Sequence, residues 1–324
     1  AVRGLDLDIR RGEVAAIVGE SGSGKSASML AALGLLEPNA VAGGSVRFDG
    51  RELMGAPLNV LQGLRGGRIG MIFQDPMTSL NPTMRVGRQI TEAGVDAAEG
   101  VRLLTAVGVT QPELRMQVFP HELSGGMRQR VMAAIALSGS PSLIIADEPT
   151  TALDVTIQAQ ILDLLRTLKD KLGMSLILIT HDLGVVAAEA DEVAIMYAGR
   201  VVERSTTRSL FQAPAHPYSQ GLLASIPSLH VRSERLASIP GTVPDLLHPP
   251  AGCRFRERCG RASARCAADD PALARREATA DPMVACLDPH RLHVAANRRE
   301  DRALRVLAAL SGRKGQLDRR HDGR

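Results

Sequence analysis

An α/β fold built around a parallel sheet is predicted by two features of this 324-residue sequence. The first is the short apolar run Val14–Val18, which ends at a glycine-rich stretch before a helical pattern begins. The second is Leu143–Ala146, which is apolar at every position, as strands buried on both faces of a parallel sheet are. Both runs are short enough for strands, and each is followed by a helical segment.

The glycine-rich stretch has the spacing G-x-x-x-x-G-K-S, which is typical of a phosphate-binding loop. Its glycines allow a nest of backbone N–H groups that point at phosphate oxygens, and the helix N-terminus adds its positive end. Lys25 is expected to reach the β- and γ-phosphates, and Ser26 to bind Mg²⁺. A glycine-rich turn that precedes a lysine by chance is the alternative, which the flanking strand and helix disfavour. We assign the whole stretch to nucleotide binding: Gly19, Glu20, Ser21, Gly22, Ser23, Gly24, Lys25 and Ser26.

Local patterns predict the elements on either side of this loop. Leu5–Ile9 alternates apolar and polar residues and predicts a strand, and the chain is expected to begin part-way into a domain. The helix after the loop is expected to run through Leu36 and to be closed by Pro38. Gly44–Phe48 predicts another strand, which ends at an Asp-Gly turn.

A helical insertion is predicted farther along the chain. Ile69–Phe73 is an apolar strand followed by Gln74, whereas residues 86–140 have helical spacing and few β-branched runs. Within the insertion, a loop ends and a helix opens before Val131–Leu137. Small residues at this helix N-terminus leave room for a second anion to bind: Ser124, Gly125 and Gly126.

Acidic residues follow the strand Leu143–Ala146 directly, as Asp147 and Glu148. Ligands of open α/β sheets bind at the carboxyl ends of the strands, and a buried carboxylate is costly unless a cation or proton compensates it. A helix over 156–171 and a strand over Ser175–Thr180 place His181 at another strand end. A single histidine is more often a core residue, but in this series we interpret His181 as a phosphate ligand.

The composition is that of a globular chain, with 44% hydrophobic and 23% charged residues. No apolar run approaches the ~20 residues that a membrane span requires. The net charge of +4 originates in residues 291–324, where ten Lys and Arg stand against four Asp and Glu. Because the rest of the chain is slightly acidic, we interpret this segment as a solvated basic tail and expect no nucleic-acid partner.

Taken in order, the motifs resemble those of the nucleotide-binding subunit of ATP-binding-cassette (ABC) transporters. The matching motifs are the phosphate loop Gly19–Ser26, Gln74, Leu123–Gln129, Leu143–Glu148 and His181. Thr151–Asp154 also matches the loop that follows the catalytic glutamate in that family. The resemblance implies a P-loop NTPase domain with a parallel-sheet core, an antiparallel β subdomain and a helical subdomain.

The same resemblance implies a role for each matching residue. Lys25 and the loop amides would hold the phosphates of ATP, Glu148 would polarise the attacking water, and His181 would contact the γ-phosphate. Gln74, with a catalytic role as well, would bind Mg²⁺ together with Ser26 and Asp147. Ser124, Gly125, Gly126 and Asp154 would contribute to nucleotide binding, with Ser124 and Gly126 closing over the ATP of a partner subunit. The aromatic residue that stacks on adenine in this family is missing from residues 1–12.

The C-terminal part of the chain narrows the resemblance. His216–Tyr218, Ile239–Pro244 and Cys253–Cys259 are similar to the extension of oligopeptide and dipeptide importer ATPases. We therefore expect an ABC domain over 1–215, an irregular cysteine-containing extension over 216–290 and a tail over 291–324. The implied function is ATP hydrolysis that drives peptide uptake. The alternatives are uptake of nickel or another small solute and, more distantly, a soluble ABC ATPase of DNA repair or translation, without transport.

The resemblance also implies partners and a location. The partners are a second ABC ATPase subunit, more often different than identical, two transmembrane permease subunits and, indirectly, an extracytoplasmic solute-binding protein. The chain would lie peripherally on the cytoplasmic face of the membrane.

All four cysteines lie in the extension, with the spacing C-x₅-C-x₆-C-x₁₉-C: Cys253, Cys259, Cys266 and Cys286. Disulfides are disfavoured in the cytosol, and zinc sites usually contain C-x₂₋₄-C pairs, which are missing here. Interleaved arginines would offset the negative charge of four thiolates around a cluster. We therefore expect a [4Fe–4S] cluster, as related importer ATPases with this cysteine pattern carry; zinc and free cysteines are the alternatives.

Overall fold

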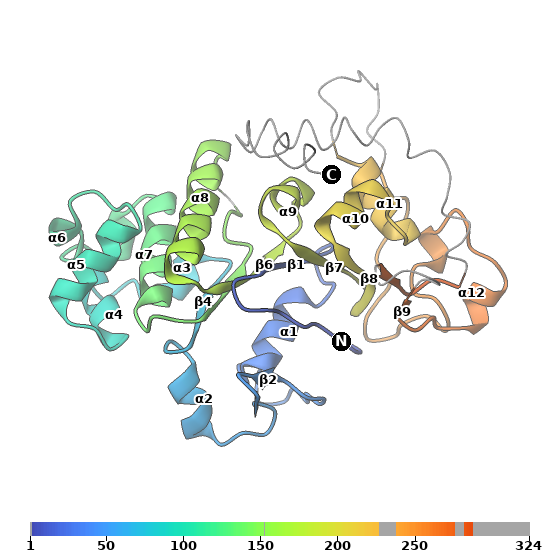
Figure 1. The fold of residues 1–324 in the computed structure, drawn as a ribbon, viewed down its shortest axis with the longest axis horizontal. Coiled ribbons are helices and arrows are strands. Elements are labelled where there is room, and N and C mark those ends of the chain that lie inside the picture. Colours follow the sequence, from blue (N-terminus) through green and yellow to red (C-terminus); the bar gives the residue numbers. More distant parts are fainter. Residues whose placement is uncertain (1, 152, 227–237, 276–281, 288–324) are drawn as a thin grey trace, which may run out of the picture. The chain divides into compact units, whose positions relative to one another are not determined.

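The computed structural model describes residues 2–151, 153–226, 238–275 and 282–287, and the tail predicted over 291–324 lies outside them. The chain divides into two compact units (Figure 1). The first unit contains the described residues of 1–7, 15–25 and 180–324, and the second contains residues 8–14 and 26–179. Each unit combines strands with helices, and each contributes residues that the sequence assigns to nucleotide binding.

The second unit is built on three parallel strands whose order is β4-β5-β6. Ile69 of β4 pairs with Leu143 of β5, which in turn pairs with Ser175 of β6. All six residues of β6 are buried, as in strands that are covered on both faces of a parallel sheet. The strands of this unit are β2 (Arg47–Phe48), β3 (Arg51–Glu52), β4 (Ile69–Ile72), β5 (Leu143–Asp147) and β6 (Ser175–Thr180).

Helices make up most of the second unit between β4 and β5, as the helical spacing predicts, and Figure 1 draws α4 to α7 as one group. Helix α7 is central because it contacts α3, α4, α5, α8 and β4. The helices of this unit are α1 (Lys25–Ala32), α2 (Leu58–Leu64), α3 (Pro76–Ser79), α4 (Val86–Glu92), α5 (Ala97–Ala106), α6 (Pro112–Arg115), the 3₁₀ helix η1 (Pro120–Glu122), α7 (Gly125–Leu137) and α8 (Val155–Leu172).

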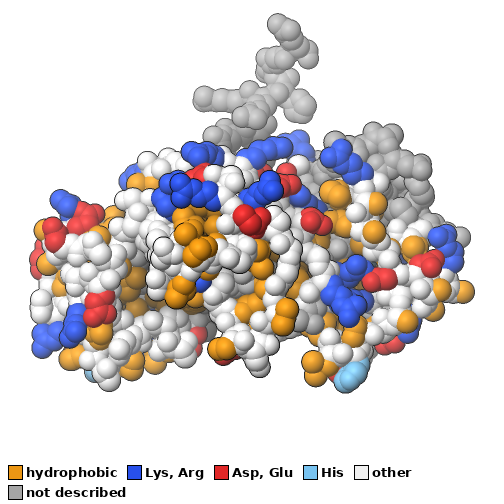
Figure 2. Space-filling model, turned by 90° about the horizontal axis from the view of Figure 1, so that it is seen from below, with side chains coloured by type: hydrophobic (Ala, Val, Ile, Leu, Met, Phe, Trp, Pro, Cys, Tyr) orange, Lys and Arg blue, Asp and Glu red, His pale blue; other side chains and the backbone are white. Residues whose placement is uncertain are grey.

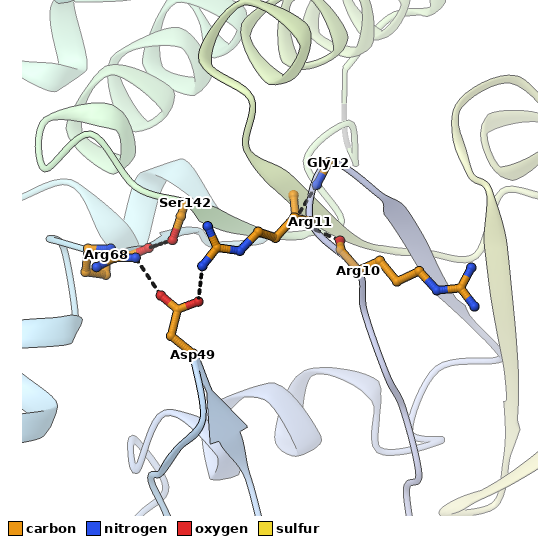
Figure 3. A network of polar contacts seen from close by, with 7 residues as sticks. Arg10, Arg11, Gly12, Asp49, Arg68 and Ser142 are labelled. Atoms are coloured by element: carbon orange, nitrogen blue, oxygen red, sulfur yellow. Dashed lines mark hydrogen bonds and ion pairs between the residues drawn. The ribbon is translucent and has the colours of Figure 1, made fainter.

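Polar contacts tie the β2–β3 turn to the neighbouring segments of the second unit (Figure 3). The Asp49 carboxylate pairs with Arg11 at 2.8 Å and with Arg68 at 2.6 Å, and the Arg68 guanidinium lies 5.8 Å from the centre of the Phe48 ring. The Ser175 hydroxyl accepts from the backbone of Gly12 and donates to that of Arg10, each at 3.0 Å. The arginines are largely exposed, so these pairs determine local geometry more than they add stability.

The first unit pairs β1 with β7 in parallel and then continues through antiparallel strands in the order β7-β8-β10-β9. Its core contains Tyr197, Tyr218 and Phe255, whose ring centres lie 4.7 to 5.4 Å apart. The elements of this unit are β1 (Val14–Val18), α9 (Leu183–Glu189), β7 (Glu192–Tyr197), β8 (Arg200–Thr206), α10 (Thr207–Gln212), α11 (Pro217–Ala224), the 3₁₀ helix η2 (Arg256–Arg258), α12 (Arg265–Ala268), β9 (Ala274–Arg275) and β10 (Met283–Val284).

Two of the elements predicted near the phosphate loop differ in the structure. Leu5–Ile9 forms no strand, although its apolar residues are partly buried and its polar ones exposed, as the alternation predicts. The helix expected to reach Leu36 ends at Ala32, because Gly34 adopts a left-handed φ of 64° that turns the chain out of the helix. The antiparallel subdomain is present as the pair β2 and β3.

The surface exposes single apolar residues, of which Val41 (98%), Val155 (81%) and Leu247 (82%) are the most exposed. Figure 2 shows one face, on which hydrophobic side chains lie among charged ones. Among the described helices, none combines the length and the apolar character that crossing a membrane demands.

A buried histidine caps α11 in the first unit. His216 is 1% exposed, and its Nδ1 accepts a hydrogen bond of 3.0 Å from the Tyr218 N–H. Burial lowers the pKa of His216 from 6.5 to about 3, so the imidazole stays neutral in the folded chain at pH 5. In the unfolded chain the same ring binds a proton below about pH 6.5.

His216 should therefore make folding dependent on pH between about 6.5 and 5. The unfolded state binds one more proton than the folded state in this window, so stability falls as the pH falls. In urea unfolding at several pH values, His216→Asn, which keeps a capping acceptor, should reduce the slope by up to about 1.4 kcal/mol per pH unit. An unaltered slope in His216→Asn would contradict the buried neutral ring.

Candidate functional site

The phosphate loop begins where β1 ends, and its first residue leaves no space for a side chain. A Cβ on Gly19 would lie 2.2 Å from the Met196 carbonyl oxygen of β7. Gly22 and Gly24 have φ angles of 75° and 95°, which fits the backbone expected for a nest of N–H groups. Helix α1 begins at Lys25, so the loop ends at a helix N-terminus, as the sequence predicts.

Two polar side chains of the loop are buried. Lys25 is 5% exposed, and its Nζ donates to the carbonyl oxygens of Gly19 at 2.8 Å and Glu20 at 3.2 Å. The Ser23 hydroxyl is buried and has no hydrogen-bond partner. A buried ammonium and a buried hydroxyl without a partner fit a loop that binds phosphate oxygens.

The carboxylate at the end of β5 lies beside the hydroxyl that follows the loop lysine. Asp147 is 5% exposed, and its Oδ1 accepts a hydrogen bond of 2.9 Å from Ser26 Oγ. A hydroxyl and a carboxylate are the oxygen ligands that Mg²⁺ prefers. This pair therefore fits the predicted magnesium ligands.

Glu148 is held by two side chains of the second unit. Its Oε2 accepts from Gln74 Nε2 at 3.1 Å and from Thr151 Oγ1 at 2.9 Å. The backbone of Glu148 has a φ of 45°, which is uncommon for a residue with a side chain and typical of functional sites. The Glu148 N–H donates to the carbonyl of Ile179 at 2.9 Å, which anchors this conformation. The sequence prediction gave Thr151 no role, although its hydroxyl lies three residues after the glutamate.

Other predicted residues lie at helix ends. The side chain of Ser124 caps α7 by accepting from Met127 N–H, and that of Asp154 caps α8 by accepting from Ile157 N–H. Gly125 and Gly126 open α7, and a Cβ on Gly126 would lie 2.8 Å from the side chain of Ile157. His181 is exposed and directly follows β6.

Residues of the C-terminal part hold the phosphate loop from outside the motif. The Glu20 N–H donates to the Tyr218 hydroxyl at 3.0 Å, and the Glu20 carboxylate pairs with Arg258 at 2.9 Å. The Gly199 N–H donates to the Ser23 carbonyl at 3.0 Å. Sequence reasoning missed these contacts, because no motif links Tyr218 or Arg258 to the loop.

The four cysteines line one pocket, together with His216, Phe255, Arg256 and Arg261 among others. None of the four forms a disulfide, and the Cys253 N–H donates to the Cys266 carbonyl at 2.8 Å. Burial raises the pKa of Cys253 to about 11, and the thiols of Cys266, Cys259 and Cys286 raise it as well. Burial also raises the pKa of Cys259. Within the described ranges, no set of three or more His, Cys, Asp and Glu side chains is already arranged as a metal site.

Comparison with known families matches two parts of the chain. The family model described as ABC transporter matches residues 2–151. The model described as oligopeptide/dipeptide transporter, C-terminal region, matches residues 202–266, which include Tyr218, Arg258 and three of the four cysteines.

Curated relatives are similar over most of the chain. The oligopeptide transport ATP-binding protein OppD of Bacillus subtilis is 53% identical over 270 residues, which cover 80% of this chain and 75% of that protein. Its namesake in Escherichia coli is 49% identical over 298 residues, covering 89% and 88%. The dipeptide transport ATP-binding protein DppD of Escherichia coli is 48% identical over 283 residues, covering 84% and 86%.

Solved structures are similar over about two thirds of the chain. The ATP-binding cassette MJ0796, in a dimeric post-hydrolysis state bound to ADP and Pi, has a TM-score of 0.56 and 27% identity. That match covers 64% of this chain and 90% of the solved one.

Proposed function

We infer that this chain hydrolyses ATP to power peptide uptake, because it belongs to the ABC transporter family, in the branch of the oligopeptide and dipeptide transport ATP-binding proteins. The observation that carries the proposal is the pair of carboxylates at the end of the inner strand β5, Asp147 and Glu148, each bonded to another residue of the predicted site. The names of the relatives favour peptides as the transported solute, over nickel and over a role without transport.

The chemistry follows from where charge develops during phosphoryl transfer. The transition state spreads negative charge over the phosphoryl oxygens, so positioning and charge stabilisation supply most of the catalysis. Lys25 turns from the carbonyls of its own loop to the β- and γ-phosphates, whose oxygens also accept from the loop amides. Mg²⁺, held by Ser26, Asp147 and Gln74, offsets phosphate charge when bound.

Glu148 orients and polarises the attacking water in this proposal. The hydrogen bonds from Gln74 and Thr151 fix the direction of the carboxylate that would accept a proton from the water. His181 contacts the γ-phosphate. Gln74 reports the presence of that phosphate to the helical segment, because it lies two residues before α3, which contacts α7.

The proposed complex contains a second ATPase subunit, two permease subunits and, indirectly, an extracytoplasmic solute-binding protein. Ser124, Gly125, Gly126 and Asp154 would face the ATP of the second subunit. Exposure of the Ser124 and Asp154 side chains supports this assignment, since both are accessible to a partner. We propose two different ATPase subunits and a peripheral position on the cytoplasmic face of the membrane.

Changing Glu148 to Gln should separate ATP binding from hydrolysis. The amide keeps the shape of the side chain but cannot polarise water, so kcat should fall by at least about 100-fold while ATP affinity is retained. The assembled complex should then accumulate in a closed, ATP-bound state. Glu92→Gln, an exposed change in α4, is the matched control and should hydrolyse ATP at the normal rate.

Two results would contradict the proposed function, one for the role of Glu148 and one for the transported solute. The first is normal hydrolysis by the Glu148→Gln complex, which would remove Glu148 from the chemistry. The second is ATP-driven uptake of Ni²⁺ and not of labelled oligopeptides by the reconstituted wild-type transporter, which would make nickel the substrate.

We further propose that the four cysteines hold a [4Fe–4S] cluster. Their convergence on one pocket and the absence of disulfides among them support this proposal. Their arrangement falls short of a ready metal site, so binding requires the thiols to turn toward the cluster. Burial raises the pKa of Cys253, and a bound cation would stabilise its thiolate. Arg256 and Arg261 in the pocket lining offset the negative charge of the bound thiolates.

Protein purified without oxygen should contain iron and acid-labile sulfide and absorb broadly near ~400 nm, as thiolate-bound clusters do. Cys266→Ser should lose iron, because one of four ligands is removed. Ala268→Ser, which adds the same side chain at an exposed position in α12, should keep it. A colourless protein with stoichiometric zinc, or with four thiols that react freely, would overturn the cluster proposal.

A further inference from the structure

The phosphate loop is fastened at Glu20 by two residues that follow the nucleotide-binding motifs. The Glu20 N–H donates to the Tyr218 hydroxyl at 3.0 Å, and its carboxylate accepts from Arg258 Nη1 at 2.9 Å. One bond holds the main chain of the loop and the other holds its side chain. Because both the main chain and the side chain of Glu20 are held, the loop backbone that follows Glu20 has little freedom to move.

Arg258 joins three segments of the first unit. Its Nε donates to the Pro240 carbonyl at 2.9 Å, and its Nη2 donates to the Ile239 carbonyl at 3.4 Å. Its Nη1 also donates to the Tyr197 hydroxyl at 3.4 Å, and the guanidinium carbon lies 5.6 Å from the centre of that ring. The side chain is 6% exposed, so its charge depends on Glu20 as its ion-pair partner.

The side chain of Tyr218, like that of Arg258, is held by several neighbouring residues. It is 0% exposed, and its ring packs on those of Tyr197 and Phe255 at 4.7 and 5.4 Å. Its own N–H donates to His216 Nδ1, so the start of α11 is fixed. The hydroxyl that accepts from Glu20 is therefore attached to a packed core.

The position of Arg258 is determined by the segment that carries the cysteines. Arg258 ends η2, and its N–H donates to the Phe255 carbonyl at 3.0 Å. The next residue is Cys259, whose N–H donates to the Arg256 carbonyl at 3.2 Å. A change at the cysteine pocket that moves η2 would move Arg258, and with it the carboxylate of Glu20.

We propose that Arg258 is a positioning residue of the ATP site, through which the cysteine-containing segment controls the conformation of the phosphate loop. The proposal rests on the ATP-binding role of this loop given above. Tyr218 holds the loop main chain, whereas Arg258 transmits the state of the segment. ATP affinity thus depends on what the four cysteines bind.

The test measures equilibrium binding of a fluorescent ATP analogue to the full chain. Arg258→Met should raise the Kd about tenfold, within the range of couplings between linked sites, and Arg258→Lys should have a smaller effect. Glu257→Met is the matched control, because Glu257 lies in the same helical turn, is exposed and is not part of the cysteine pocket lining. An equal loss of affinity in Glu257→Met would show general damage to the segment and overturn the proposal.

Two double variants separate positioning from a merely structural role. Glu20→Gln should weaken ATP binding no further when Arg258 is already Met, because the two changes break the same link. Cys266→Ser should raise the Kd in the wild-type background and leave it unchanged in Arg258→Met. Additive effects in either cycle would overturn the proposal.

A further variant tests the ATP-binding role of the loop separately from the positioning role of Arg258. Lys25→Ala should abolish binding of the analogue if the loop binds ATP. If Lys25→Ala binds normally, the proposed function of the loop fails. If Lys25→Ala loses binding while Arg258→Met does not, only the positioning role fails.

Discussion

The parallel pairing of β1 with β7 determines where the phosphate loop begins, and the other features of the loop depend on this starting point. The pairing ends with Val18 opposite Ile195. The residues that follow, Gly19 and Met196, are so close that a Cβ on Gly19 would lie 2.2 Å from the Met196 carbonyl oxygen. Only glycine fits there, and the chain can then turn at once into the loop. Because the loop starts at a fixed point and ends at α1, its amides have little freedom to point elsewhere.

Desolvation explains the arrangement at the end of β5. A buried carboxylate is costly unless hydrogen bonds or a cation compensate it, and Asp147 receives a hydrogen bond from Ser26. Glu148 is less buried and accepts two hydrogen bonds, while its backbone occupies the left-handed region. Holding the backbone of a residue with a side chain in the left-handed region costs of order 1–3 kcal/mol, which the surrounding hydrogen bonds offset. The result is a carboxylate with a fixed direction.

Local patterns were sufficient for the central strands and for the loop. Leu143–Ala146 and Leu176–Ile179 lie in strands because a continuous apolar run of that length satisfies both faces of a parallel sheet. Leu5–Ile9 shows the limit of the same reasoning: its alternation gave the correct buried side, but a strand also requires a ladder partner, which periodicity does not reveal. The end of α1 was missed because Gly34 lies within an apolar helical pattern and only its φ shows that the helix stops.

Local patterns could not predict the contacts that hold the phosphate loop, for a different reason. Glu20 and Arg258 are 238 residues apart, so neither has a local signal that names the other. Arginines within the cysteine segment were expected to offset thiolate charge. Arg256 and Arg261 line the cysteine pocket, whereas Arg258 points its guanidinium to a carboxylate of the phosphate loop. A buried arginine requires a partner of opposite charge, and the loop motif supplies one at a position where its spacing allows any residue. The variable positions of a phosphate loop are therefore where a family branch can attach its own extension, since the motif fixes the glycines, the lysine and the serine.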